Sequence, residues 1–250
     1  MSKKTRLLLI GIVACGLVGL LPAQLWAAPA IDLQISSTDD PEQVVDTLEL
    51  LAVLTVLAIA PAILIMMTSF TRIVVVLAFV RNALATQQIP PNQVLIGLAL
   101  FLTFFTMFPV YQEINEKALT PYVMNQMSQE QALAEAKAPM VNFMAKHTRE
   151  KDLALFLQMS EEPKPENIAD LPLNVLIPAF VISELKTAFQ MGFYIYVPFL
   201  VIDMVVASTL MSMGMFMVPP ILISLPFKIL LFVMTDGWFL LTKSLLESYV

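Results

Sequence analysis

The chain has 250 residues, of which 58% are hydrophobic and 14% are charged. Soluble domains carry about a quarter charged residues, so this composition, with a mean hydropathy of +0.78, indicates a membrane protein. The net charge of −6 excludes the basic surface that nucleic-acid binding requires, and it gives the chain as a whole no attraction to anionic lipid.

Residues 1–28 are predicted to be a cleaved secretory signal peptide. Its basic start, Lys3, Lys4 and Arg6, precedes an apolar run over residues 7–21. Small residues suited to cleavage follow at Ala27, Ala28 and Ala30, and the mature chain is expected to begin near Ala28. A lipid-modified Cys15 is disfavoured because the apolar run continues past it, and an uncleaved first helix is the alternative.

Residues 29–47 form an acidic leader without Lys or Arg, which predicts a mobile extracytoplasmic segment. Cys15 is the only cysteine, so a cleaved chain could carry no disulfide, cysteine nucleophile or thiolate metal site. The only histidine, His147, can complete neither a zinc site nor a catalytic triad, and it is expected at the surface of a charged helix. We therefore expect no cofactor, no metal and no enzymatic activity.

Residues 48–111 are predicted to form an apolar helical hairpin. The first helix covers residues 50–71, where Pro61 should produce a kink. Arg72 and Arg81 place the following segment towards the cytoplasm by the positive-inside rule. A turn at Pro90-Pro91 then sends residues 94–110 back as a second helix.

Residues 112–170 hold many of the charged side chains, between apolar residues at helical spacing. This pattern predicts a small helical domain, and the expected topology places it in the periplasm. A loop with Pro163 and Pro165 ends it.

Residues 171–250 are predicted to be pore-forming apolar helices. Breaks are expected at Pro178, at Pro198 and at Pro219-Pro220. A last helix is expected over residues 225–246. Hydropathy indicates about four spans along the whole chain, at ~20 residues each. The expected fold class is thus an all-α membrane protein made of Pro-broken apolar helical hairpins plus a small helical periplasmic domain.

Charged side chains inside the apolar segments are costly unless they are paired or hydrated, so they indicate function or assembly. Glu184 and Lys228 have opposite signs and are expected to pair, either within one chain or with a partner from a neighbouring subunit. Asp203 and Arg72 are the second expected pair. The alternative is that some of these groups face water in a channel.

A methionine-rich segment ends at Pro219-Pro220 and contains Met211, Met213, Met215, Phe216 and Met217. Flexible thioethers make an adaptable apolar surface, and a Gly-flanked, Pro-terminated loop is poorly suited to a core. A deformable constriction in a pore is favoured over core filling between helices.

The sequence resembles the FliP family of flagellar type III export gates, whose injectisome relatives are the SctR proteins. The matching stretches are FTRIVVVLAFVRNAL (70–84), PPNQVLIGLALFLTFF (90–105), TREKDLALF (148–156), IPAFVISELKTAFQMGF (177–193), VVAS (205–208), GMFMVPP (214–220) and LPFKILLFVMTDGW (225–238). They cover nearly all of residues 50–250 in order.

The resemblance implies a ring of subunits, expected to be a pentamer, within a helical complex around a channel for unfolded flagellar proteins. It also implies the partners FliQ, FliR, FlhB and FlhA, seeding of the rod, and a place in the bacterial inner membrane and on the periplasmic face of the basal body. A methionine triplet seals the channel in this family. Met215, Phe216 and Met217 occupy the matching positions, so the middle residue departs from the pattern.

Three alternative functions compete with this hypothesis. An injectisome gate of the SctR type is the first, although the signal and the sizeable periplasmic insert favour the flagellar branch. A solute or ion channel or permease is the second, but such proteins usually show inverted repeats or a convergent polar site, and neither is visible. An intramembrane enzyme would need a nucleophile–base pair or a metal set, which is equally unreadable.

Overall fold

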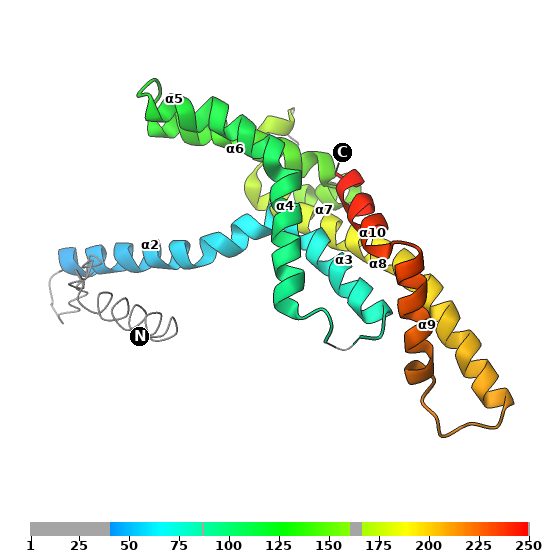
Figure 1. Ribbon diagram of the computed structural model, residues 1–250. Coiled ribbons are helices and arrows are strands. Elements are labelled where there is room, and N and C mark those ends of the chain that lie inside the picture. Colours follow the sequence, from blue (N-terminus) through cyan, green and yellow to red (C-terminus); the bar gives the residue numbers. More distant parts are fainter. Residues whose placement is uncertain (1–40, 87, 161–166, 250) are drawn as a thin grey trace, which may run out of the picture. The chain divides into compact units, whose positions relative to one another are not determined.

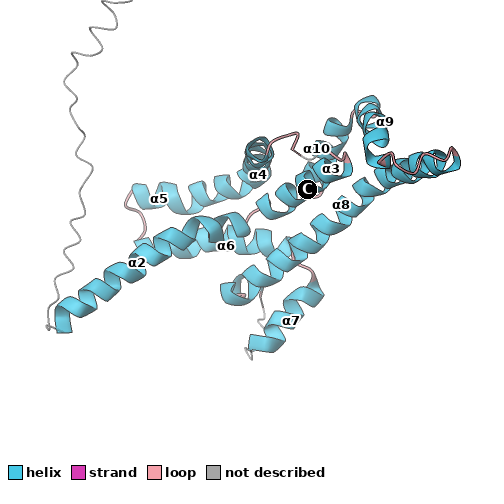
Figure 2. Cartoon of the chain, turned by 90° about the horizontal axis from the view of Figure 1, so that it is seen from below, coloured by secondary structure: helices cyan, strands magenta, loops and turns pink. Residues whose placement is uncertain are grey.

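The computed structural model describes residues 41–86, 88–160 and 167–249 (Figure 1). The predicted signal peptide and most of the acidic leader lie outside the described residues. Within them every regular element is a helix (Figure 2), which confirms the all-α class. The main helices are α2 (Pro41–Met66), α3 (Phe70–Ala83), α4 (Asn92–Ile114), α5 (Thr120–Val123), α6 (Gln129–His147), α7 (Glu150–Ser160), α8 (Leu173–Ser212), α9 (Pro220–Met234) and α10 (Gly237–Glu247).

Residue contacts divide the chain into two units, Met1–Leu54 and Thr55–Val250, and the core described below belongs to the second. Helix α2 runs through Pro61 and ends at Met66, five residues before the expected end of the first apolar helix. The Thr68 hydroxyl explains this end: it donates to the Ile65 carbonyl at 2.8 Å and accepts from the Phe70 N–H at 3.4 Å. Such local bonds compete with continued helix and favour a turn.

The core forms where α3 packs along α8. Helix α3 buries Ile73, Val76, Leu77 and Val80, whose spacing places them on one face of a helix. Helix α8 supplies Leu176, Phe180 and Ala188 to the same cluster. Helices α6, α7 and α9 also pack against α8, so this helix organises the second unit.

Helices α3 and α4 form a hairpin, with its turn between Ala83 and Asn92 (Figure 1). The predicted hairpin had residues 50–71 as its first helix, and most of that stretch belongs to α2 instead. Helix α4 continues into a π-helical turn, Asn115–Leu119, and then into α5. Its outer side exposes the phenylalanines Phe101, Phe104, Phe105 and Phe108. An apolar face of this kind requires lipid or another protein to cover it.

Helix α8 continues through Pro178 and Pro198, so the two predicted breaks are wrong. Each proline removes one backbone hydrogen bond, yet buried residues continue on both sides of Pro178, from Leu176 and Phe180 to Glu184. Keeping that stripe against α3 requires an unbroken helix. The break before Pro219-Pro220 is confirmed, because α8 ends at Ser212 and α9 begins at Pro220.

The last predicted helix, residues 225–246, is wrong as a single element. Helices α9 and α10 are bent by 63° at a break between Met234 and Gly237. Asp236 has a φ of 51°, a left-handed conformation that aspartate tolerates better than most residues. A Cβ atom on Gly237 would lie 2.3 Å from the Phe232 ring, so the bend also depends on glycine.

Within the described residues, fewer helical segments are long and apolar enough to cross a membrane than the four that hydropathy suggested for the whole chain. Among the described residues, two helical segments are long and apolar enough, Asn92–Val123 and Leu173–Ser212. The bent pair α9–α10 could supply a third, while the apolar part of α2, Leu50–Ile63, is shorter than a span requires.

The predicted small domain, residues 112–170, contains the end of α4, then α5, α6 and α7. Helix α6 begins with a capping box: the Ser128 hydroxyl accepts from the Gln131 N–H, and the Gln131 side chain accepts from the Ser128 N–H. The amphipathic run does not form one helix, because Thr148 adopts an extended conformation between α6 and α7. The periplasmic location of this region stays a prediction.

Candidate functional site

The methionine-rich loop connects α8 to α9 at the tip of their hairpin (Figure 1). Gly214 ends α8 with a φ of +75°, and its N–H donates to the Met211 carbonyl at 3.0 Å. The apolar side chains of the loop are exposed, reaching 96% exposure at Met217. Within this one chain they are therefore not core residues, and their apolar surface is available to neighbouring molecules.

The most buried ion pair among the described residues joins Arg72 of α3 to Glu184 of α8. The Arg72 Nε donates to Glu184 Oε2 at 3.0 Å, and Nη2 donates to Oε1. Glu184 is 0% exposed and Arg72 is 3% exposed. This bidentate geometry satisfies the carboxylate and fixes the guanidinium plane.

Residues after α10 complete this network. The Tyr249 hydroxyl donates to Glu184 Oε2, and the Arg72 guanidinium carbon lies 4.0 Å from the centre of the Tyr249 ring. Arg72 Nη1 also donates to the Ser248 carbonyl and hydroxyl oxygens, at 3.1 and 2.9 Å. The network, defined here as Arg72, Glu184, Ser248 and Tyr249, ties the segment after α10 to α3 and α8.

A second ion pair joins α8 to α9. Lys228 Nζ donates to Asp203 Oδ2 at 2.6 Å, and the Ser224 hydroxyl donates to Asp203 Oδ1. Lys228 is 2% exposed, whereas the Asp203 side chain is 29% exposed. The carboxylate therefore keeps partial access to solvent while the ammonium group depends on it.

The structure pairs these four charged residues differently from the sequence prediction. Glu184 binds Arg72 and not Lys228, and Lys228 binds Asp203, all within one chain. The predicted partners were thus wrong, because sign alone cannot choose between two acids and two bases. Additional contacts of these groups with neighbouring subunits stay a prediction.

His147 is only partly exposed, contrary to the expected surface position. Its ring centre lies 4.9 Å from that of Phe143 and 5.0 Å from that of Tyr249. Burial, followed by the charges of Arg72 and Lys146, lowers the pKa of His147 to about 4. The imidazole is therefore neutral at pH 7.

The start of α7 is fixed by hydrogen bonds to side chains whose role was not predicted from the sequence. The Arg149 N–H donates to the Ser183 hydroxyl at 3.0 Å, and this hydroxyl donates to the Asp152 carboxylate at 2.8 Å. The Arg149 guanidinium donates to Thr187 and Gln190 on α8. Ser183, Thr187 and Gln190 are spaced so that they share one face of an otherwise apolar helix. This pattern in the sequence could have indicated the contact.

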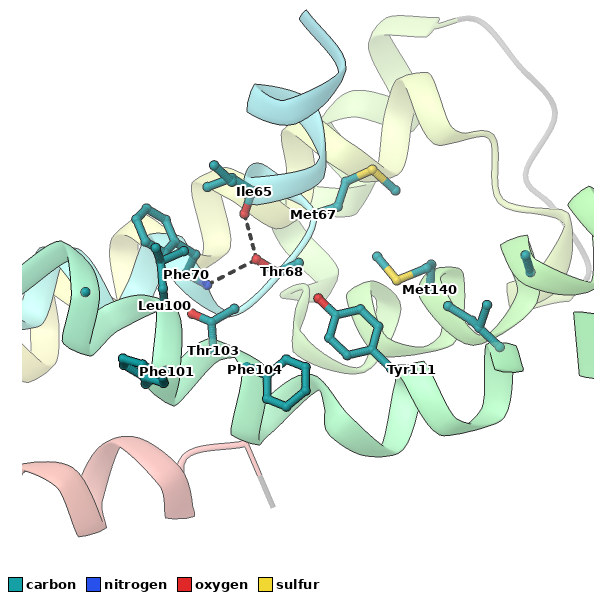
Figure 3. A pocket seen from close by; sticks show the side chains of 13 residues that line it. Ile65, Met67, Thr68, Phe70, Leu100, Phe101, Thr103, Phe104, Tyr111 and Met140 are labelled. Carbon is teal, nitrogen blue, oxygen red and sulfur yellow. Dashed lines mark hydrogen bonds between the residues drawn. The ribbon is translucent and has the colours of Figure 1, made fainter. Parts of the chain in front are cut away.

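An apolar groove of about 730 Å³ lies between the end of α2, α4 and α6. Figure 3 shows Phe101 and Phe104 of α4 on one side and Met67 and Met140 on the other, with Tyr111 between them. A Cβ atom on Gly97, which also lines the groove, would meet no other atom within 4 Å. The groove is large enough to accept apolar side chains of a partner.

Comparison with known proteins decides the family. The model of the FliP family matches residues 53–245. The chain belongs to the FliP family. Its FliP relatives include the "Flagellar biosynthetic protein FliP" of Bacillus subtilis (strain 168), 62% identical over 217 residues, which covers 87% of this chain and 98% of the relative.

Other FliP relatives come from other bacteria. The protein of the same name from Pectobacterium carotovorum is 54% identical over 203 residues, 81% of this chain and 79% of the relative. That of Aquifex aeolicus is 50% identical over 223 residues, 88% of this chain and 92% of the relative. The FliP match thus includes α3, α8, α9, both ion pairs and the methionine-rich loop.

Proposed function

We propose that the chain is a channel-forming subunit of the flagellar type III protein export gate. In this role it passes unfolded flagellar proteins across the inner membrane and seeds the rod. Family membership and the names of the relatives support the flagellar assignment. The observation that carries the channel role is the exposed methionine-rich loop, because a contiguous apolar segment such as Met213, Phe216 and Met217 is exposed mainly where another molecule covers it.

The loop suits a seal that opens for a passing chain. A ring of apolar side chains dewets a narrow pore, so ions cannot cross without losing hydration. Thioether side chains repack around different sequences at little cost. Met215, Phe216 and Met217 are the proposed sealing residues, and Met211 and Met213 flank them.

Such a seal requires several copies around one axis. We infer a ring, expected to be a pentamer, assembled with FliQ and FliR and completed by FlhB and FlhA. The exposed phenylalanines of α4 and the groove beside them provide apolar surface for these contacts. The charge pairs Arg72–Glu184 and Asp203–Lys228 would orient α3, α8 and α9 for assembly and could add contacts to the next subunit.

The proposed placement is the inner membrane and the periplasmic face of the basal body. Residues 1–28 would be removed as a signal, residues 29–47 would follow as a periplasmic leader, and the helical region over residues 112–170 would face the periplasm. The hairpin over residues 48–111 and the helices over residues 171–250 would then build the channel wall.

Ion flux tests the channel role. Met215→Ala, Phe216→Ala and Met217→Ala together should leave assembly intact but allow ions or a small dye to cross the inner membrane of expressing cells. Met211→Ala with Met213→Ala is the matched control and should stay tighter at equal expression. A triple variant that assembles and remains as tight as the parent would refute the seal. Solute uptake by the chain alone in liposomes would instead favour a permease.

A further inference from the structure

A second groove, of about 680 Å³, lies where α3 meets the middle of α8. Most of its lining is aromatic, from Phe79, Phe189, Phe193, Tyr194 and Tyr196. Phe79 contacts Phe189 edge to face, with the ring centres 5.2 Å apart. A Cβ atom on Gly192 would come within 2.5 Å of the Phe79 ring, so this glycine allows the aromatic wall to form.

One end of this aromatic groove is cationic. Lys186 lines the groove itself, and it interacts electrostatically with Lys151 and Arg149 of the neighbouring α7 region. The Arg149 Nη2 group donates to Thr187 at 3.3 Å and to Gln190, which also lines the groove. Three basic side chains from two parts of the chain are therefore associated with this groove: Lys186 lines it, Arg149 is bonded to Gln190 of its lining, and Lys151 interacts with Lys186.

The acids near these three side chains do not balance them. Asp152 interacts with Lys186 and also accepts from the Ser183 hydroxyl, and Glu150 stands between Arg149 and Lys151 in the sequence, so two acids stand against three cations. Over the described ranges, neither Lys151 nor Lys186 has a carboxylate within ion-pair distance. Neighbouring like charges are unfavourable, so the cluster favours an anion between them. The local charge here is opposite to the net charge of the chain.

We propose that this groove binds an anionic phospholipid, with its phosphate on Lys151, Lys186 and Arg149 and an acyl chain along the aromatic wall. Helix α8 is long and apolar enough to span a membrane, so lipid would be the solvent beside any stretch of it that lies in the bilayer. Basic pockets next to membrane helices bind anionic headgroups. Free phosphate would satisfy the cations but leave the aromatic wall uncovered.

Lipid retention on the purified full-length protein tests the site. The protein is extracted in mild detergent, incubated with phosphatidylglycerol or phosphatidylcholine, and analysed by native mass spectrometry. The parent should retain phosphatidylglycerol preferentially. Lys151→Gln with Lys186→Gln should reduce that retention by about fivefold per lysine, with phosphatidylcholine unchanged.

Two further variants separate headgroup from chain and local from general effects. Tyr194→Ser should weaken both lipids, because it removes part of the aromatic wall. Lys243→Gln, on α10, outside the lining of the groove and paired with Glu247, should change neither. Equal retention of both lipids by the parent would overturn the proposal. So would inorganic phosphate that abolishes the preference for phosphatidylglycerol, if Tyr194→Ser leaves lipid retention unchanged. Because retention is measured without transport, its outcome is independent of the ion-flux test of the channel.

Discussion

The Tyr249 hydroxyl donates to the Glu184 carboxylate across a separation of 65 residues in the sequence. Glu184 simultaneously accepts two hydrogen bonds from Arg72, so a single buried carboxylate joins three separate segments. The Arg72 guanidinium lies over the Tyr249 ring, which adds a cation–π contact to the same group. Removing different members of the network should therefore have different costs.

Glu184→Ala should destabilise the protein by about 3–5 kcal/mol, because Arg72 would remain buried without its carboxylate. Tyr249→Phe removes one hydrogen bond and keeps the ring over Arg72, so it should cost about 1–2 kcal/mol. Thermal unfolding in detergent measures both. Lys243→Ala, which breaks an exposed pair, should match the parent. Equal losses for Glu184→Ala and Tyr249→Phe would contradict the central role of the carboxylate.

The Asp203–Lys228 pair should respond asymmetrically to neutralisation. Asp203→Asn would leave the ammonium group, which is 2% exposed, without its counter-ion, at a cost of about 3 kcal/mol. Lys228→Met keeps the buried volume and leaves a carboxylate that still reaches solvent, at a cost of about 1 kcal/mol. Unfolding temperatures of the two variants compare these losses. The reverse order would mean that Lys228 has another partner in the assembled protein.

His147 should cause the stability of the protein to fall in mildly acidic solution. Its pKa is lowered to about 4 in the folded chain, against about 6.5 for an unperturbed histidine. Between these values the unfolded state binds more protons than the folded state, so stability is complete above about pH 6.5 and falls as the pH drops towards 4. His147→Gln should flatten that part of the profile. The measurement is the unfolding temperature of both proteins from pH 7.5 to 4.5, and parallel curves would exclude His147 as the cause.

Gly214 and Gly97 should respond oppositely to alanine. Gly214→Ala places a side chain at a φ of +75°, which should cost about 1 kcal/mol or more and disturb the methionine-rich loop. Gly97→Ala lies in a helix where the new Cβ atom meets nothing, so it should stabilise the chain by up to about 1 kcal/mol. Unfolding temperature and ion flux together test the pair. A Gly214→Ala protein with parental stability and tightness would show that the loop relaxes freely.

Local patterns in the sequence predicted the helices well where one physical effect dominates. The Pro90-Pro91 turn and the end of α8 before Pro219-Pro220 were both predicted, since two prolines in succession exclude helix. Pro178 and Pro198 were misread, because the packing of α8 along α3 outweighs the loss of single backbone bonds. The α9–α10 bend had a signal in Asp236-Gly237, a common turn dipeptide, that the apolar surroundings obscured.

Partners of the charged residues could not be predicted from sequence. That Glu184 needs a partner followed from the cost of a buried charge, but the choice of Arg72 depends on how α3 lies along α8. Tyr249 and Ser224 gave no sign of their roles, because a hydroxyl becomes informative only when the fold places a charge beside it. His147 was assigned to the surface for the same reason, since the aromatic rings that cover it come from distant positions.

The length of helix α8 also relates its two ion pairs to the thickness of a membrane. Glu184 and Asp203 both belong to this one continuous helix, and at 1.5 Å per residue they lie about 28 Å apart along its axis. The hydrocarbon layer of a bilayer is about 30 Å thick. A membrane around this stretch would therefore place one ion pair at each of its two boundaries with water, and Lys186 beside the first. The remaining turns of α8, up to Leu173 at one end and Ser212 at the other, would then extend beyond the hydrocarbon layer on both sides of the membrane.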